Sequence, residues 1–213
     1  MPFQPFITIT SRIVPLRIDH IDTDQIIPAR FLKSVASTGF GDHLFHDWRY
    51  DAEGYPNRSF ILNQPAGQGS ILLAGRNFGC GSSREHAAWA LLQYGFRVVI
   101  SSGFADIFRN NALNVGLLPL EITIEELNSL FETTLRFPGS FWTIDLPNQI
   151  IRRSIVATNQ SFHNDIQDDI CFNINPFRKR CMVEGIDLVE FLVALRPEVE
   201  QFELNRAVEE AWI

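Results

Sequence analysis

Residues 75–90 gather most of the side chains in this chain that could take part in catalysis or ligand binding. The stretch reads GRNFGCGSSREHAAWA and follows directly on the apolar run 71–74. Its glycines would let the backbone approach a ligand closely, and its serines or cysteine could act as bases or nucleophiles. Its arginine carries a planar group that binds carboxylates and phosphates. Several kinds of site therefore have to be weighed against one another.

A nucleotide-binding loop is a poor match to this stretch. The P-loop requires a lysine before its Ser or Thr, whereas here Gly81 is followed by Ser82 and Ser83. The dinucleotide-binding pattern requires a third glycine where Arg84 stands. A cysteine nucleophile remains open, because a thiol near a helix start has a lowered pKa. Nothing in the spacing shows, however, that His86 can reach the sulfur of Cys80.

Ser82 and Glu85 match the S-x-x-E capping box ahead of an Ala-rich helix, which is a structural role. The same position also suits a carboxylate ligand, because a helix start offers free N–H groups and the positive end of a dipole. The guanidinium of Arg84 could bind a carboxylate through two parallel hydrogen bonds. A serine in that field could accept a proton from a carbon next to the bound carboxylate. These residues permit several substrates and do not choose among them.

The surrounding sequence predicts alternating strands and helices that would place this turn at the edge of a parallel sheet. Strands are predicted at 70–75, 96–101 and 117–122, with helices at 83–94 and 104–114 that end at Gly95 and Gly116. This β-α-β-α-β order with short connections implies a parallel sheet with right-handed crossovers.

The flanking segments predict further elements around that core. They are a strand at 6–18 broken at Pro15, a polar turn at 19–34, an irregular segment at 37–60, a helix at 124–134, a hairpin at 139–154, two short helices at 176–195 broken at Gly185, and a charged helix at 198–212. We therefore expect one α/β domain over residues 1–213 with a helical tail from about residue 176.

Composition limits the class of protein. Hydrophobic residues make up 46% of 213, so a large core can be buried, and the net charge of −7 argues against a nucleic-acid partner. We expect no signal peptide and no membrane span. The three cysteines (Cys80, Cys171 and Cys181) form no CxxC pair, so we expect neither a disulfide framework nor a metal or cluster site on this chain. A reducing cytoplasm is the expected compartment.

Three blocks of the sequence resemble the small, swivelling domain of the aconitase superfamily. They are DHIDTDQIIPARFLK at 19–33, ILLAGRNFGCGSSREHAAWAL at 71–91 and GFADIFRNNALNVGLLPL at 103–120. With GFGDHLFHDWRY at 39–50 and FRKRCMVEGID at 177–187, the resemblance covers nearly the whole chain. Within the superfamily it is closest to the small subunits of bacterial 3-isopropylmalate dehydratases. It implies a swivelling β/β/α domain.

The resemblance implies a hydro-lyase that isomerises 2-isopropylmalate and 3-isopropylmalate by dehydration and rehydration in leucine biosynthesis. It implies a large-subunit partner that carries a [4Fe-4S] cluster, in a heterodimer or heterotetramer, with no cofactor bound by this chain. The first serine of the GSSRE motif, Ser82, would be the base, with Ser83 and Arg84 binding the small dicarboxylate substrate. Four further residues are expected to bind substrate on the same grounds: Asp22, Thr23, Asp24 and Lys33.

The resemblance also attributes substrate selectivity to the loop from about residue 31 to residue 50. Its apolar side chains could face an isopropyl group (Phe31, Leu32, Val35, Phe40 and Leu44). Citramalate, a methylmalate, would fit the same chemistry, because a hydrophobic pocket discriminates one or two methyl groups by only about 1–3 kcal/mol. A cysteine hydrolase using Cys80 and His86, and a non-catalytic carboxylate-binding module, are the alternatives from other classes.

Overall fold

The computed structural model describes residues 3–32, 38–154 and 169–210. They form an α/β fold around a seven-stranded sheet of order β4-β3-β2-β1-β5-β6-β7. The strands are β1 (Thr8–Leu16), β2 (Ile71–Ala74), β3 (Val98–Ser101), β4 (Leu118–Glu121), β5 (Phe141–Asp145), β6 (Ile150–Ser154) and β7 (Ile170–Cys171). β1 to β4 are parallel, and β5, β6 and β7 are antiparallel to their neighbours.

The long strand β1 joins the parallel and antiparallel halves of the sheet. Its first part pairs with β5, from Thr8 opposite Asp145, and its last part pairs with β2, from Ile13 opposite Ile71. The predicted break at Pro15 is wrong, because the strand continues through that residue to Leu16. Pro15 is tolerated because β5 no longer pairs with β1 there, so the strand is locally an edge and can lack one N–H donor.

The predicted parallel core is confirmed. Helices α3 (Glu85–Tyr94) and α4 (Asp106–Asn114) connect β2, β3 and β4, and both are followed by glycines with positive φ, Gly95 and Gly116. The four residues of β2 and of β3 are fully buried, as expected for parallel strands covered on both faces. The carboxyl ends of these strands and the amino end of α3 therefore meet at one edge of the sheet, where α/β proteins bind their ligands.

Hydrophobic cores lie on both faces of the sheet. Alternate residues of a strand point to opposite faces, so Leu72 belongs to the core under α3 and α4 and Leu73 to the core under the helix α5 (Ile124–Arg136). Thr123 and Glu126 form a capping box that fixes the start of α5. The hairpin of β5 and β6 around Pro147 and Asn148 is also confirmed. Each helical layer is thus held by its own set of apolar contacts.

Short helical turns that periodicity does not reveal precede β2. The polar turn predicted at 19–34 contains α1 (Thr23–Ile26) and η1 (Ala29–Phe31), and the segment predicted as irregular at 37–60 contains η2 (Phe40–His43) and α2 (His46–Arg49). They are followed by η3 (Ile61–Asn63) and η4 (Pro65–Gly67). Of these turns, α1 and η2 pack against α3, and η3 and η4 pack against β1. Together with the residues between them, the turns supply many of the aromatic residues of the core under α3. Elements of three or four residues are too short for a helical repeat in the sequence to be visible.

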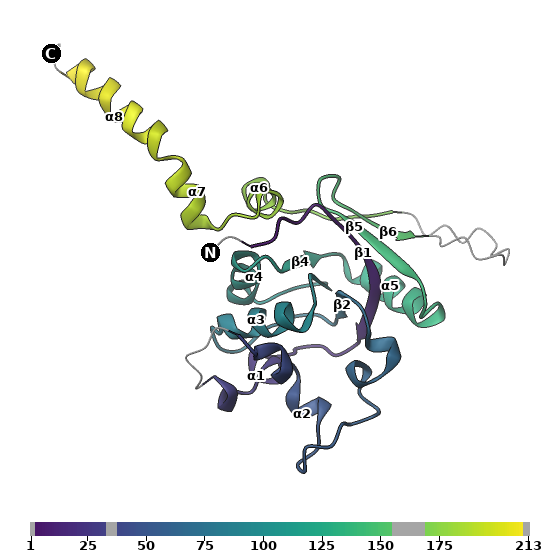
Figure 1. Ribbon diagram of the computed structural model, residues 1–213. Helices are drawn as coiled ribbons and strands as arrows, with labels where there is room; N and C mark the ends of the chain where they lie inside the picture. The colour runs from purple at the N-terminus through teal and green to yellow at the C-terminus, as the bar shows by residue number, and fades with distance from the viewer. Residues whose placement is uncertain (1–2, 33–37, 155–168, 211–213) are drawn as a thin grey trace.

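The carboxyl-terminal tail consists of α6 (Pro176–Glu184), α7 (Leu188–Ala194) and α8 (Arg196–Glu210), which confirms the predicted break at Gly185. α6 packs against the body of the molecule, whereas α7 and α8 extend away from it (Figure 1). Across the described ranges, no helix has the length and apolar character needed to cross a bilayer.

Candidate active site

Two loops meet at the carboxyl edge of the parallel strands. The first follows β1 and the second follows β2, and they are joined by backbone hydrogen bonds from Gly79 N to Ile21 O (2.8 Å) and from Thr23 N to Cys80 O (2.9 Å). These bonds continue the β1–β2 pairing beyond the ends of the strands. They bring the 22-DTD-24 turn against the GCGSSRE segment, so two of the resembling sequence blocks form one site.

Gly79 makes this close approach possible. Its φ of +74° lies in the left-handed region, and a Cβ atom built there would come within 2.2 Å of the Phe108 ring. Both the backbone conformation and the contact with α4 therefore require glycine at this position. The neighbouring Gly81 also has a positive φ, which turns the chain back towards Thr23 before Ser82.

The predicted capping box between Ser82 and Glu85 is wrong. Helix α3 begins at Glu85, its N-cap residue is Arg84, and no side chain caps its first turn. Ser82 precedes the helix in a tight turn in which Arg84 N donates to Ser82 O (2.9 Å). The missing cap suits a ligand-binding site, because the first N–H groups of α3 remain available to a ligand. Ser82 has no capping role and can take part in the site.

The side-chain hydroxyl group of Thr23 contacts Ser82. The Thr23 residue is only 2% exposed, and its Oγ1 donates to Ser82 O (3.1 Å) and lies 3.3 Å from Ser82 Oγ. A rotation of the single hydroxyl hydrogen can direct it to either oxygen of Ser82, so Thr23 can support Ser82 both as a hydroxyl and as an alkoxide. This burial favours a positioning role for Thr23 over the direct substrate contact that the resemblance implies.

Replacing Thr23 by valine tests this positioning role. Valine keeps the buried shape and removes the hydroxyl, so we expect kcat of the assembled enzyme to fall about tenfold while KM stays unchanged. A hydrogen bond to a charged group contributes about 1.5–3 kcal/mol, which supports an effect of that size. Thr23→Ser, which keeps the hydroxyl, should recover most of the rate in the same steady-state assay. A raised KM at constant kcat would instead indicate direct substrate contact.

Arg84 forms an ion pair with Asp24 across the two loops. The Arg84 side chain is 21% exposed and the Asp24 side chain 53%, so the pair lies at the mouth of the site. The hydrogen bond from Arg84 holds the pKa of the Asp24 carboxyl below its usual range. Asp24 therefore stays ionised at neutral pH and holds the Arg84 guanidinium in this place.

The structure places the remaining predicted residues differently. The Asp22 carboxylate accepts a hydrogen bond from Gln25 N (2.7 Å), and Asp22 N donates to Gln25 Oε1 (2.8 Å), which forms a capping box at the start of α1. The sequence 22-DTDQ-25 contains the capping-box signal, although the prediction for this segment is only a polar turn. Ser83 is exposed beside Ser82. Lys33 and Val35 lie outside the described residues.

The cysteine-hydrolase alternative finds no support in this geometry. The Cys80 thiol donates to His20 O (3.4 Å), and burial together with the nearby Asp22 raises the pKa of Cys80. The His86 ring packs edge-on against Phe40 and Trp89, with ring centroids 5.0 Å and 4.9 Å away. A thiol with a raised pKa is a poor nucleophile at neutral pH, and His86 fills a packing position.

A Cys80→Ala substitution separates the two interpretations. If Cys80 only lines the turn, the assembled enzyme should keep kcat within about threefold of the wild type, because a small side chain replaces another of similar volume. Steady-state turnover of the dicarboxylate substrate is the measurement. Complete loss of turnover with an unchanged melting temperature would restore Cys80 as a catalytic residue.

The prediction that apolar side chains of the loop from about residue 31 to residue 50 face an isopropyl group is wrong for two of the residues named. Phe40 and Leu44 are buried in the core beside α3 and cannot line a pocket for substrate. Phe31 and Leu32 are half-buried in the first part of the loop. The Phe31 ring stacks on His43 at 4.0 Å, which fixes it at the surface near Arg30.

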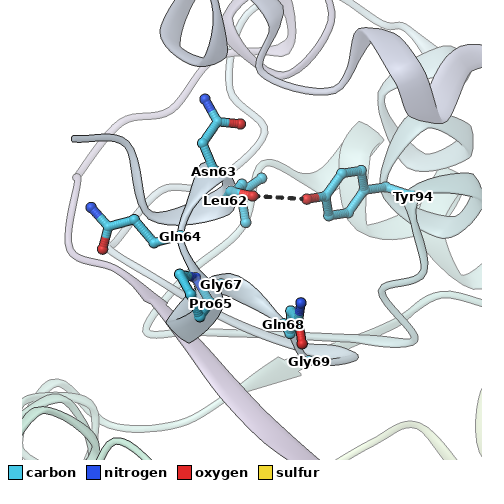
Figure 2. A pocket seen from close by; sticks show the side chains of 8 residues that line it. All are labelled: Leu62, Asn63, Gln64, Pro65, Gly67, Gln68, Gly69 and Tyr94. Carbon is cyan, nitrogen blue, oxygen red and sulfur yellow. Dashed lines mark hydrogen bonds between the residues drawn. The ribbon is translucent and has the colours of Figure 1, made fainter. Parts of the chain in front are cut away.

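A hollow of about 510 Å³ lies at the opposite end of β2 and α3 and is unsuited to a dicarboxylate (Figure 2). It is lined by neutral residues of 62–69 and by Tyr94, whose hydroxyl donates to Leu62 O (3.3 Å). The carboxyl end of α3 lies there, and the negative end of a helix dipole repels anions. This hollow therefore lacks the carboxylate-binding features found at the edge that holds Ser82 and Arg84.

Comparisons with known proteins show the family of the chain. Residues 3–125 match the aconitase C-terminal domain family. The chain is 48% identical to the 3-isopropylmalate dehydratase small subunit of Cytophaga hutchinsonii, over 94% of each chain. It is also 48% identical to that of Azobacteroides pseudotrichonymphae, over 95% of this chain and 98% of the relative.

Among solved structures, the fold is similar to the crystal structure of 3-isopropylmalate dehydratase from Methanocaldococcus jannaschii. The TM-score is 0.60 at 28% identity, and the match covers 92% of this chain and 99% of that one. The resemblance inferred from the three sequence blocks is thus confirmed over nearly the full length, in sequence and in fold. The chain belongs to the family of 3-isopropylmalate dehydratase small subunits, within the aconitase superfamily.

Proposed function

We propose that this chain is the small subunit of a hydro-lyase that interconverts 2-isopropylmalate and 3-isopropylmalate in leucine biosynthesis. The observation that carries the proposal is the placement of Ser82 Oγ, held by the buried Thr23 hydroxyl beside Arg84 and ahead of the uncapped first turn of α3. This arrangement places a proton acceptor, Ser82, and a carboxylate-binding residue, Arg84, at one edge of the sheet. The names of the relatives support the same substrate.

In the proposed reaction, Ser82 acts as the base of the dehydration. Its oxygen accepts the proton from the carbon next to a carboxylate, the C–H electron pair forms the carbon–carbon double bond, and hydroxide leaves from the adjacent carbon. Arg84 binds the carboxylate and offsets the negative charge that builds up on it as the proton departs. Rehydration reverses these steps with the proton and the hydroxyl exchanged between the two carbons.

The chain's own residues do not fit an iron–sulfur cluster. Cys80 is half-buried, Cys171 exposed and Cys181 buried on a separate helix, and no group of three metal-ligating side chains occurs among the described residues. Departure of hydroxide requires a Lewis acid, which we propose is the [4Fe-4S] cluster of a large-subunit partner. The small subunit supplies the proton transfer and one carboxylate contact.

We further propose that the two subunits form a heterodimer or a heterotetramer in which the Ser82 edge faces the partner. Ser82 and Ser83 are exposed on this chain, which leaves the site open on one side. The closing wall must come from another chain for water to be excluded during the reaction. The three free cysteines suit a reducing compartment, and we place the enzyme in the cytoplasm.

Reconstitution tests the proposal. The chain is co-expressed with its cognate large subunit, and the purified complex is assayed on isopropylmalate and on citramalate. We expect turnover of both, with a higher kcat/KM for isopropylmalate, and no turnover by either subunit alone. Hydration or dehydration by the small subunit in the absence of its partner would overturn the subunit assignment. A higher kcat/KM for citramalate would move the assignment to a methylmalate hydro-lyase.

A further inference from the structure

Helices α7 and α8 present an apolar stripe that the rest of the described chain leaves uncovered. Leu192 is 58% exposed and Phe202 66% exposed, and Leu188 and Val199 are exposed as well. With the half-buried Leu195, these five residues are spaced by four, three, four and three positions. This alternation is the repeat by which one helix packs along another, so the stripe lies on a single face.

Helices α7 and α8, together called the α7–α8 rod, follow one another along this stripe, with Leu195 between them. Leu195 N donates to Phe191 O (3.2 Å) and Val199 N donates to Leu195 O (3.1 Å), so Leu195 is bonded to both helices, although Pro197 has no N–H to continue the helical ladder. Asp187 and Glu190 form a capping box that fixes where the rod begins. Both parts of the stripe therefore lie on helices that are already formed in this chain.

Contacts at its base set the direction of the rod. The Phe191 ring packs edge-on against Phe177 of α6, with centroids 4.6 Å apart, and Arg180 lies 5.5 Å from the centre of the Phe191 ring. α6 is linked to α4 by hydrogen bonds from Arg178 to the side chains of Asn110 and Asn114. α8 lies beyond these contacts and projects from the molecule (Figure 1).

A second copy of the chain is a poor occupant of the stripe. Residues 188–210 contain six glutamates and two arginines, so two such helices would repel each other. In a parallel pair, Glu198 of one copy would stand opposite Glu203 of the other, at the positions that flank a helix–helix seam. Complementary charge instead requires a partner whose groove has an apolar floor and basic rims.

We propose that the α7–α8 rod docks into such a groove on the large subunit and provides a second contact of the complex, apart from the Ser82 edge. This inference rests on the proposed function for the identity of the partner. The apolar stripe supplies the buried contact, and the flanking glutamates face lysines or arginines on the large subunit. Docking of a preformed helix into an apolar groove is a common mode of protein recognition.

The test uses the full-length chain with a double substitution, Leu192→Gln and Phe202→Gln, and measures its binding to the cognate large subunit by titration calorimetry. We expect Kd to rise at least about tenfold, because two exposed anchors are lost. Leu204→Gln is the matched control: Leu204 is 63% exposed but lies outside the stripe, and Kd should stay within about threefold. Circular dichroism should show equal helix content in all variants.

Several outcomes would overturn the inference. Unchanged binding by the double variant, or equal weakening by Leu204→Gln, would show that the stripe is not the contact. A wild-type small subunit that is a dimer by light scattering, and a double variant that is monomeric, would assign the stripe to self-association. The readout is binding and not turnover: a complex that forms through the stripe but does not convert isopropylmalate would refute only the proposed function.

Discussion

Ser82→Ala is expected to lower kcat of the assembled enzyme at least about 100-fold, the usual scale for loss of a positioned base. No other described side chain shares its hydrogen bond to Thr23 Oγ1 next to Arg84, so no neighbour can take over the proton. The free energy of unfolding should change by less than about 0.5 kcal/mol, because Ser82 is exposed and does not cap α3. The measurements are steady-state turnover and thermal unfolding.

A matched control for this variant is Ser59→Ala. Ser59 is also an exposed serine with one side-chain hydrogen bond, to Asn57 Oδ1 (2.6 Å), but it lies in the segment before β2, away from the Ser82 edge. Its kcat should equal that of the wild type. Near-normal turnover by Ser82→Ala would remove Ser82 from the mechanism and leave Arg84 and the helix start as a binding site alone.

Arg84→Lys is expected to raise KM between about 10-fold and 100-fold while the two subunits still assemble. A lysine keeps the positive charge but has a single ammonium group, which cannot hold Asp24 and a substrate carboxylate in one fixed plane. Loss of one charged hydrogen bond, at about 1.5–3 kcal/mol, gives an effect of this size. Initial-rate kinetics on isopropylmalate give KM, and analytical gel filtration gives the extent of assembly.

The control for this substitution is Arg152→Lys. Arg152 also pairs with a carboxylate, that of Asp169, but it lies on β6 in the antiparallel half of the sheet. KM should not change in this variant. An unchanged KM in Arg84→Lys would mean that Arg84 only braces the loop through Asp24, and the carboxylate grip would have to come from the partner.

The parallel core was predictable because each of its signals is local. The apolar runs of β2, β3 and β4 and the glycines after α3 and α4 lie next to one another in the chain, and the structure agrees with them closely. The contact between Thr23 and Ser82 was not predictable from local pattern, because 59 residues separate the two hydroxyl groups. Only the pairing of β1 with β2 brings them together.

The start of α3 shows why a motif can predict the wrong local geometry. Ser82 and Glu85 satisfy the capping-box pattern, yet Arg84 is the N-cap residue and Ser82 turns towards Thr23. The tertiary contact with Thr23 outweighs the local preference for a cap, which is worth about 1 kcal/mol. At α1, where no such contact competes, the Asp22 and Gln25 pair forms the capping box in full.

The position of β1 between β2 and β5 has a consequence for how the chain acquires its site. β1 precedes both of its partners in the chain and leaves the ribosome before they are made: they are residues 71–74 and 141–145. Contacts between distant segments form slowly, because a long loop must close before they gain any stability. Thr23 can meet Ser82 only after β2 has been made and paired. The edge that holds Ser82 therefore forms late in folding, and a nascent chain carries β1 unpaired until β2 and β5 have been made.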